Sequence, residues 1–436
     1  MSAGGPNAWE PVLDGELRRA AEQAVEEICG EVETFASDSQ VPPGVLADCA
    51  LLNAYLAVAR HDDRCSKLAN RFLEAAIDAL AETAMRPGLH GGFTGLAWIV
   101  EHLQHPPFAV AEAAAESDSN SEIDEALLTY LAAPRWKDVY DLIGGLVGFG
   151  VYALERLPRP SAVACLERVV NHLDATSTQE GEDVTWWTPP ELLPQISREQ
   201  GETGYFNLGV SHGVPGVIGF LAQARHVRQV NPKVERMLAG AVSWLLKQRL
   251  PREAASVFAH TTGGSSEARP SRSAWCYGDP GIAVVLLTAA RSAKSAQWEA
   301  EALQTGLTAA RRDPARCGVV DGGLCHGAAG LAHIYNRMWH ATGEGTFANA
   351  SRLWFERTLQ MRKAGQGVAG FAAYVPQVDP TLQWRSDREF LTGATGIALA
   401  LLAATSSVEP LWDRLLLTAI QPKSGERGAT RTRTGE

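Results

Sequence analysis

The chain has 436 residues and a formal net charge of −11, with 45% hydrophobic and 20% charged residues. This balance is typical of a globular protein with a sizeable core and excludes an intrinsically disordered chain. The negative charge argues against nucleic acid or an anionic membrane as the main partner, because both are bound through basic patches that displace counterions.

The N-terminal sequence, MSAGGPNAWEPVLDGE, lacks the charged and apolar regions of a signal peptide, and no apolar run is long enough to form a transmembrane segment. We therefore expect a cytoplasmic protein that reaches a membrane only peripherally, through partners. The seven cysteines form an odd set without the spacing of a disulfide framework. Four of them lie among apolar or helical residues and are interpreted as small buried hydrophobes: Cys29, Cys49, Cys65 and Cys165.

A pair of glycines three residues apart, followed by an apolar run, recurs six times at intervals of about fifty to seventy residues. Such periodicity is typical of a repeat architecture. A seventh, degenerate copy begins at Gly44 and lacks the pair, which leaves closure of the repeats at the N-terminus open. The six pairs are Gly92 and Gly95, Gly145 and Gly148, Gly213 and Gly216, Gly278 and Gly281, Gly327 and Gly330, and Gly393 and Gly396.

The apolar runs have no polar face, which predicts helices buried on nearly all sides. Amphipathic stretches lie between them, beginning for example at Leu17, Lys67 and Val234, and these predict outer helices with one solvated face. The predicted fold is therefore all-α, an α/α toroid of seven inner and seven outer helices, with an open solenoid as the alternative. A closed ring would gather the glycine-containing ends of the inner helices around one mouth.

One toroid domain over residues 10–420 accounts for these repeats. Residues 1–9 and 421–436 are polar and rich in glycine or charge, and we expect both segments to be disordered. Two polar stretches, 111–125 and 260–273, are interpreted as loops within the repeats.

Candidate metal ligands lie just before two of the glycine pairs. Cys276 occurs in SAWCYGDPG, and the adjacent Cys325 and His326 occur in DGGLCHGAAG. Two thiolates and an imidazole suit zinc, and three protein ligands without CxxC spacing leave a position for water or substrate. Since a ring places the fifth and sixth repeats side by side, we expect these residues to hold one Zn²⁺ ion.

Candidates for acid/base chemistry lie just before the glycine pairs of two other repeats. His212 in NLGVSHGVPG and Asp141 in VYDLIGGLVG come from neighbouring repeats, and a carboxylate beside an imidazole makes a competent general acid or base. Arg272 and Tyr277 flank Cys276 and could stabilise an oxyanion. The alternatives are a helix N-cap for Asp141, a satisfied polar residue for His212, and ordinary surface or half-buried side chains for the other two. His90 also precedes a glycine pair, but no partner is identified for it.

These motifs resemble those of the lanthionine synthetase C-like (LanC) cyclases, and the likeness runs from the second repeat to the seventh. It is carried by YDLIGGLVG, WWTPPELLP, GYFNLGVSHGVPG, RSAWCYGDPG, GLCHGAAG and LTGATGIALALL. The resemblance implies a zinc-dependent Michael-type addition of peptide cysteine thiolates to dehydroalanine or dehydrobutyrine. It implies acid/base work for His212, oriented by Asp141, and enolate stabilisation or substrate positioning for Arg272 and Tyr277.

By the same resemblance, the partners are a dehydrated precursor peptide, a separate dehydratase and a transporter complex of lanthipeptide antibiotic biosynthesis. A LanC-like protein that binds or adds a small thiol such as glutathione is one alternative. A non-enzymatic scaffold stabilised by zinc is another. A zinc-dependent prenyltransferase also uses an α/α toroid, but that family holds its zinc with a carboxylate, a cysteine and a histidine.

Overall fold

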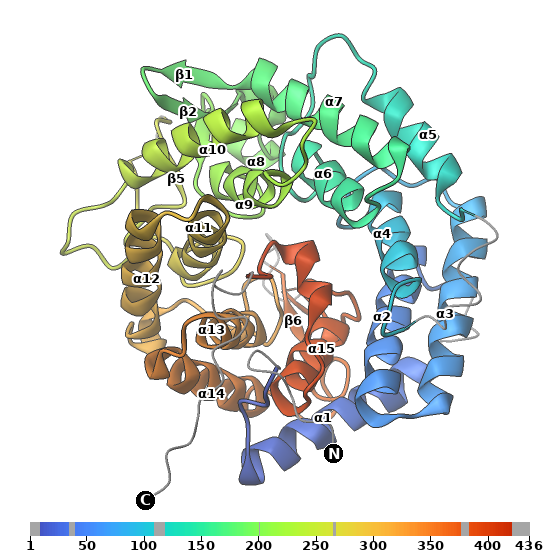
Figure 1. The fold of residues 1–436 in the computed structure, drawn as a ribbon. Coiled ribbons are helices and arrows are strands. Elements are labelled where there is room, and N and C mark those ends of the chain that lie inside the picture. Colours follow the sequence, from blue (N-terminus) through green and yellow to red (C-terminus); the bar gives the residue numbers. More distant parts are fainter. Residues whose placement is uncertain are drawn as a thin grey trace, which may run out of the picture.

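The computed structural model describes residues 9–34, 40–108, 118–199, 201–264, 267–375 and 383–420, and these form a ring of paired helices (Figure 1). Within the described ranges, seven inner helices alternate with seven outer ones, which confirms the predicted fold class. The inner helices are α2 (Pro43–Arg60), α4 (Phe93–Leu103), α6 (Leu146–Glu155), α9 (Val214–Ala224), α11 (Asp279–Ala293), α13 (Ala328–Thr342) and α15 (Ala394–Thr405). The outer helices are α1 (Gly15–Glu33), α3 (Asp63–Glu82), α5 (Ser121–Tyr130), α7 (Pro160–Thr176), α10 (Asn231–Leu246), α12 (Ala296–Ala310) and α14 (Gly345–Gln360). None of the helices in these ranges combines the length and apolarity needed to cross a bilayer.

The ring is closed, so the open solenoid is excluded. Each inner helix contacts the next one along the chain, and the last, α15, packs against the first, α2. The N-terminal segment reinforces this seam, because the backbone N–H groups of Val12 and Leu13 both donate to the carbonyl oxygen of Ala404, at 3.0 and 3.1 Å. Closure therefore occurs even though the first repeat lacks its glycine pair.

Trp9 corrects one boundary of the sequence analysis. We placed it in the disordered N-terminal segment, but its side chain is buried and its indole N–H donates to the carbonyl oxygen of Ala403 at 2.7 Å. It also stacks on the imidazole of His340. An apolar ring with a single polar N–H is well suited to such a site at the edge of the core. The predictions for residues 1–8 and 421–436 lie outside the described residues.

The loops contain short strands and short helical turns, which the sequence analysis did not predict. All of the paired strands in the described part of the chain are antiparallel, in the orders β1–β2, β3–β4–β5 and β6–β7. The strands are β1 (Thr178–Glu180), β2 (Asp183–Thr185), β3 (Trp187–Thr188), β4 (Tyr205–Asn207), β5 (Thr261–Thr262), β6 (Ala373–Tyr374) and β7 (Trp384–Arg385). The remaining helical turns are α8 (Gln195–Glu199) and the 3₁₀ helices η1 (Pro190–Leu192), η2 (Pro314–Arg316) and η4 (Leu411–Leu416).

The lumen of the ring is filled by η4. The carbonyl oxygen of Leu416 accepts a hydrogen bond from the Trp275 indole at 2.8 Å, and the Leu415 carbonyl lies 3.2 Å from Nε2 of His90. On another side, the carboxylate of Asp413 binds the guanidinium of Arg337 on α13. Because these partners come from different repeats, η4 lies inside the ring, and the centre is a packed core rather than an open channel.

The glycine pairs permit a close approach between six of the seven inner helices, all except α2, and the loops that precede them. A Cβ atom on the second glycine of each pair would lie only 1.9–2.5 Å from the carbonyl oxygen of the residue six positions earlier. No side chain fits there, so the preceding loop folds tightly over the first turn of the helix. The residues immediately before each pair are thereby held at the mouth of the ring.

Consecutive mouth loops are joined by backbone hydrogen bonds, and we call this chain of bonds the mouth belt. It fixes the distance between loops of neighbouring repeats, so side chains on adjacent loops have defined relative positions. The bonds run from His90 N to Ile143 O (3.0 Å), Leu142 N to Ser211 O (3.1 Å), Ser211 N to Cys276 O (3.5 Å), Cys276 N to Cys325 O (3.2 Å) and Cys325 N to Leu391 O (2.8 Å).

The close approach at the glycine pairs can be tested with Gly95→Ala. The new Cβ would lie 1.9 Å from the carbonyl oxygen of Leu89, so we expect a loss of about 1–3 kcal/mol in the free energy of unfolding. Urea denaturation would measure it. The control is Gly345→Ala at the start of α14, where nothing lies within 4 Å of the added Cβ. Equal stability of the two variants would contradict a steric role for the pair.

Candidate metal centre

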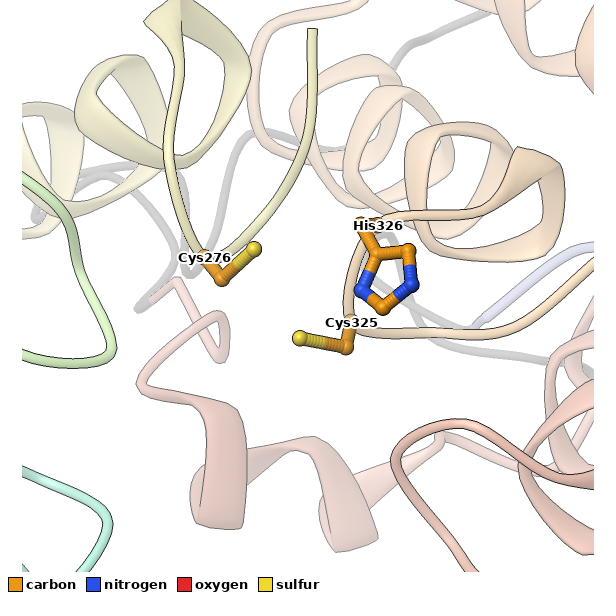
Figure 2. A group of neighbouring side chains, drawn as sticks. All are labelled: Cys276, Cys325 and His326. Atoms are coloured by element: carbon orange, nitrogen blue, oxygen red, sulfur yellow. The ribbon is translucent and has the colours of Figure 1, made fainter. Parts of the chain in front are cut away.

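Cys276, Cys325 and His326 come together at the mouth, in the loops that precede α11 and α13 (Figure 2). One ligand atom from each residue lies within 4.8 Å of the other two. Ligand atoms around a tetrahedral zinc with Zn–S bonds of about 2.3 Å are roughly 3.7 Å apart, so a small contraction would complete the site. The donor set therefore fits zinc with one coordination position left for an external ligand.

The imidazole of His326 is oriented by the groups on its outer side. Its Nε2 lies 3.4 Å from the carbonyl oxygen of Tyr374 on β6 and 3.7 Å from Oδ2 of Asp321. Figure 2 shows its other ring nitrogen on the side of the two sulfur atoms. Hydrogen bonding at one imidazole nitrogen fixes the ring and makes the other a better metal ligand. Nδ1 is thus the nitrogen of His326 that is placed to bind a metal ion.

Asp321 is a functional candidate that the sequence analysis missed. It is almost fully buried and accepts hydrogen bonds from the backbone N–H groups of Tyr374 (2.9 Å) and Gly323 (3.3 Å). It thus ties β6 and the DGGLCHG loop together beneath His326. In the sequence, Asp321 could have been noticed because it begins the DGGLCHG motif. The direction in which its side chain points, however, depends on how the loop folds.

The electrostatics of the group favour a thiolate. The hydrogen bond from the Cys325 thiol lowers the pKa of Cys276 well below its usual range, despite burial, and His326 and Arg272 act in the same direction. The Nη2 atom of Arg272 lies 3.9 Å from Cys276 Sγ. As the donor in this pair, Cys325 has a raised pKa. Thiolate is the form that binds metal, so the positive neighbours support the assignment.

His212 and Asp141 form a hydrogen-bonded pair at the same mouth. His212 Nδ1 lies 2.5 Å from Asp141 Oδ2, while Oδ1 of the carboxylate accepts a hydrogen bond from Gly144 N at 2.9 Å. Burial lowers the pKa of His212, but the hydrogen bond and negative charge of Asp141 outweigh it, so the pKa is raised above 6.5. Gly145, and not Asp141, is the N-cap residue of α6.

The His212 imidazole is accessible to a substrate, because 43% of its side chain is exposed. Nδ1 donates to the buried carboxylate of Asp141, and among the described residues Nε2 has no hydrogen-bond partner. A neighbouring carboxylate that fixes the tautomer in this way leaves the second nitrogen to exchange a proton.

Tyr277 lies between the histidine pair and the cysteine group. Its ring centroid is 6.3 Å from that of His212, and it directly follows Cys276. Burial raises the pKa of Tyr277, so the side chain remains a phenol. Its hydroxyl accepts a hydrogen bond from Nδ2 of Asn207 on β4 at 2.9 Å. Asn207 was not anticipated, since the strand that carries it is too short to be recognised in the sequence.

The mouth belt explains why these residues meet. Asp141, Ser211–His212, Cys276 and Cys325–His326 lie on four consecutive loops that the belt joins in order. The structure therefore brings all seven predicted site residues into one neighbourhood, with Arg272 on the side of Cys276. It also adds Asp321 and Asn207 as buried groups that hold them.

Comparison with known proteins agrees with this architecture. The sequence profile of the family described as lanthionine synthetase C-like protein matches residues 47–417, and the chain belongs to that family. Among solved structures, nisin cyclase is similar, with a TM-score of 0.72 and 19% identity over 91% of this chain and 97% of that chain, which shows the shared fold. A curated relative, glutathione S-transferase LANCL1 of Danio rerio, is 28% identical over 135 residues. That match covers 31% of this chain and 31% of the relative, so it spans about a third of the relative's length.

Metal binding can be tested by analysis of the purified protein. We expect about one zinc per wild-type chain and a large loss in Cys276→Ala, because two remaining ligands bind zinc poorly. Cys165→Ala removes a buried thiol in α7 and is expected to keep its zinc. Zinc content by atomic emission would decide, and full zinc occupancy in Cys276→Ala would remove this residue from the ligand set.

The orienting role of Asp321 predicts a milder effect. Asp321→Asn keeps an oxygen acceptor for the backbone but loses the negative charge beside His326, so we expect zinc affinity to fall by about 10–100-fold. Competition with a zinc-binding dye would measure the change. Asp138→Asn, at an exposed carboxylate before α6, is the control, and equal affinities in the two variants would contradict this role.

Proposed function

We propose that the protein is a zinc-dependent lanthionine-forming cyclase, which joins cysteine thiols of a dehydrated precursor peptide to dehydroalanine or dehydrobutyrine residues. The observation that carries the proposal is the His212–Asp141 pair on the loops next to the Cys276, Cys325 and His326 group. Thioether formation needs a thiolate and a proton donor within reach of the same substrate. Membership of the lanthionine synthetase C-like family supports this reaction.

The bond changes follow from the chemistry of Michael addition. Cys276, Cys325 and His326 would hold the zinc, which would lower the pKa of a substrate thiol and so supply thiolate at neutral pH. A new S–C bond then forms at the β-carbon of the dehydro residue. The π electrons of its C=C bond move toward the carbonyl and give an enolate, and protonation of the α-carbon completes the thioether.

Side chains of the protein stabilise the negative charge of the enolate and deliver the proton to the α-carbon. The protonated imidazole of His212 delivers its Nε2 proton to the α-carbon, while Asp141 holds Nδ1 and stabilises the cation. The Tyr277 phenol, fixed by Asn207, donates a hydrogen bond to the enolate oxygen, and Arg272 adds positive charge. The same imidazole, once neutral, can accept the proton of the next substrate thiol.

A second candidate function is the addition or binding of a small thiol such as glutathione. The partial match to glutathione S-transferase LANCL1 favours it, and the same side chains would carry out the thiol chemistry. Comparing glutathione with a cysteine-containing dehydrated peptide as the thiol source would separate the two candidates. A purely structural role for zinc predicts no turnover with either thiol.

The cyclase proposal includes its biological setting. The substrate would come from a separate dehydratase acting on serine and threonine, and a transporter complex would export the product as an antibiotic peptide. We infer that these steps meet in the cytoplasm. Co-purification of the protein with a dehydratase would support this arrangement.

The role of His212 predicts the outcome of His212→Ala. We expect the variant to fold and keep zinc, and the rate of ring formation to fall by about 10²–10⁴-fold because the proton donor is lost. Counting free thiols by mass spectrometry on a dehydrated peptide would measure it. The control, His226→Ala, removes an exposed histidine that follows α9. Ring formation at the wild-type rate in His212→Ala would overturn the acid/base assignment.

The pair also predicts a pH effect for Asp141→Asn. Burial continues to lower the pKa of His212 in this variant, whereas the carboxylate charge that raises it is gone, so the pKa falls. The protonated form is then lost at lower pH, and the high-pH limb of kcat/KM moves in the acid direction. An unchanged pH profile would mean that another group delivers the proton.

A further inference from the structure

The chemical residues occupy only part of the mouth. Asp141, His212, Cys276 and Cys325 with His326 lie on the loops of the third to the sixth repeats. The first, second and seventh repeats complete the ring, and none of the proposed chemistry uses them. This remaining sector adjoins the reacting residues and is available to the flanking part of a substrate peptide.

A cavity with a volume of about 330 Å³ lies in that sector. Its walls come from the start of α2, the loop before α4 and the loop before α15. Three of its lining residues belong to the mouth belt: His90 N donates to the carbonyl oxygen of Ile143, which lies two residues after Asp141, and the carbonyl oxygen of Leu391 accepts from Cys325 N. The cavity is therefore next to the reacting groups, and its size suits one or two side chains.

The cavity combines an apolar wall with negative charge. Apolar side chains make up most of the lining, and Asp48 and Glu389 are its acidic residues. Asp48 Oδ2 accepts a hydrogen bond from Phe390 N at 2.8 Å. The carboxylate of Glu389 is exposed and forms no hydrogen bond or ion pair with the residues that the structure describes, whereas the backbone N–H of this residue donates to Oδ1 of Asp387 at 2.8 Å. The carboxylate of Asp48 thus lies along the cavity wall, and that of Glu389 lies at its rim.

The cavity lining contains no lysine or arginine, and Arg385, whose charge acts on Glu389, lies outside it. Burial lowers the pKa of His90, the basic residue of the lining, to about 4, so its imidazole is neutral. Burial raises the pKa of Asp48 well above its usual range, and the charges of Glu389 and Asp387 add to the effect. An incoming cation would stabilise the ionised carboxylate, and the net charge of −11 attracts cations from a distance.

We propose that this cavity is a substrate subsite for a basic side chain, lysine or arginine, near the cysteine or dehydro residue that reacts. The aliphatic stem of such a side chain would pack on Leu89, Leu96 and Phe390, and its charged end would bind Asp48 and Glu389. The inference rests on the proposed cyclase function, and it names the substrate feature that the enzyme selects.

The test uses the full-length, zinc-loaded protein and short synthetic peptides with one cysteine, one dehydroalanine and a single lysine placed at each other position in turn. Each peptide is compared with its Nε-acetyl-lysine counterpart, which keeps the stem but loses the charge. We expect KM to be about tenfold lower for lysine at one or two positions, as for a hydrogen bond to a charged group. In Asp48→Asn, which keeps an acceptor for Phe390 N, this preference should disappear while zinc content stays unchanged.

Glu389→Gln should reduce the preference in part, and Glu16→Gln on the outer helix α1, where the side chain is 95% exposed, should leave it unchanged. Three outcomes would overturn the subsite: equal KM for both peptide series at every position, a lysine preference that is uniform along the peptide, or one that persists in Asp48→Asn. A uniform preference would reflect only long-range attraction by the acidic surface.

Binding measurements keep this test separate from the cyclase proposal. Peptides with serine in place of cysteine and alanine in place of dehydroalanine cannot react, so calorimetry on them reports affinity alone. A position-specific lysine preference that Asp48→Asn abolishes supports the subsite even if the reactive peptides give no rings, a result that would count against the cyclase. Ring formation without any lysine preference would support the cyclase and count against the subsite.

Discussion

The contact on which the rest of the structure depends is the approach of six of the seven inner helices, all except α2, to a carbonyl oxygen six residues before the second glycine of the pair. Without a side chain at that glycine, the preceding loop lies flat on the first turn of the helix, and its backbone can reach the next loop. Hydrogen bonds between the loops then follow around the mouth. Repeats that are fifty or more residues apart in sequence thus become neighbours with a fixed spacing.

That spacing divides the site between repeats. Cys276 comes from one loop and Cys325 with His326 from the next, while Asp141 and His212 come from the two loops before them. No loop carries the whole site: even the loop before α11, which contributes Arg272, Cys276 and Tyr277, depends on its neighbours, and the arrangement arises from the order of the loops. Buried groups behind the mouth, Asp321 and Asn207, then fix the orientation of the imidazole and the phenol.

Much of this could be predicted from the sequence, because the signals were local and repeated. The glycine pairs marked the inner helices, and ligand types placed just before them marked the mouth. Features that depend on tertiary contacts could not be predicted. The strands β3, β4 and β5 have two or three residues each, too few for an alternating pattern, and the burial of Trp9 becomes evident only once α15 lies beside it.

The seam at Trp9 has a consequence for how the chain is made. Trp9 and Ala403 are 394 positions apart, so the bond between them forms only after almost the whole protein has left the ribosome. Until then, α2 lacks the packing partner that α15 provides in the complete ring. Contacts between residues so far apart in sequence slow folding, and apolar surface stays exposed until they form. The incomplete ring is therefore a natural client for chaperones.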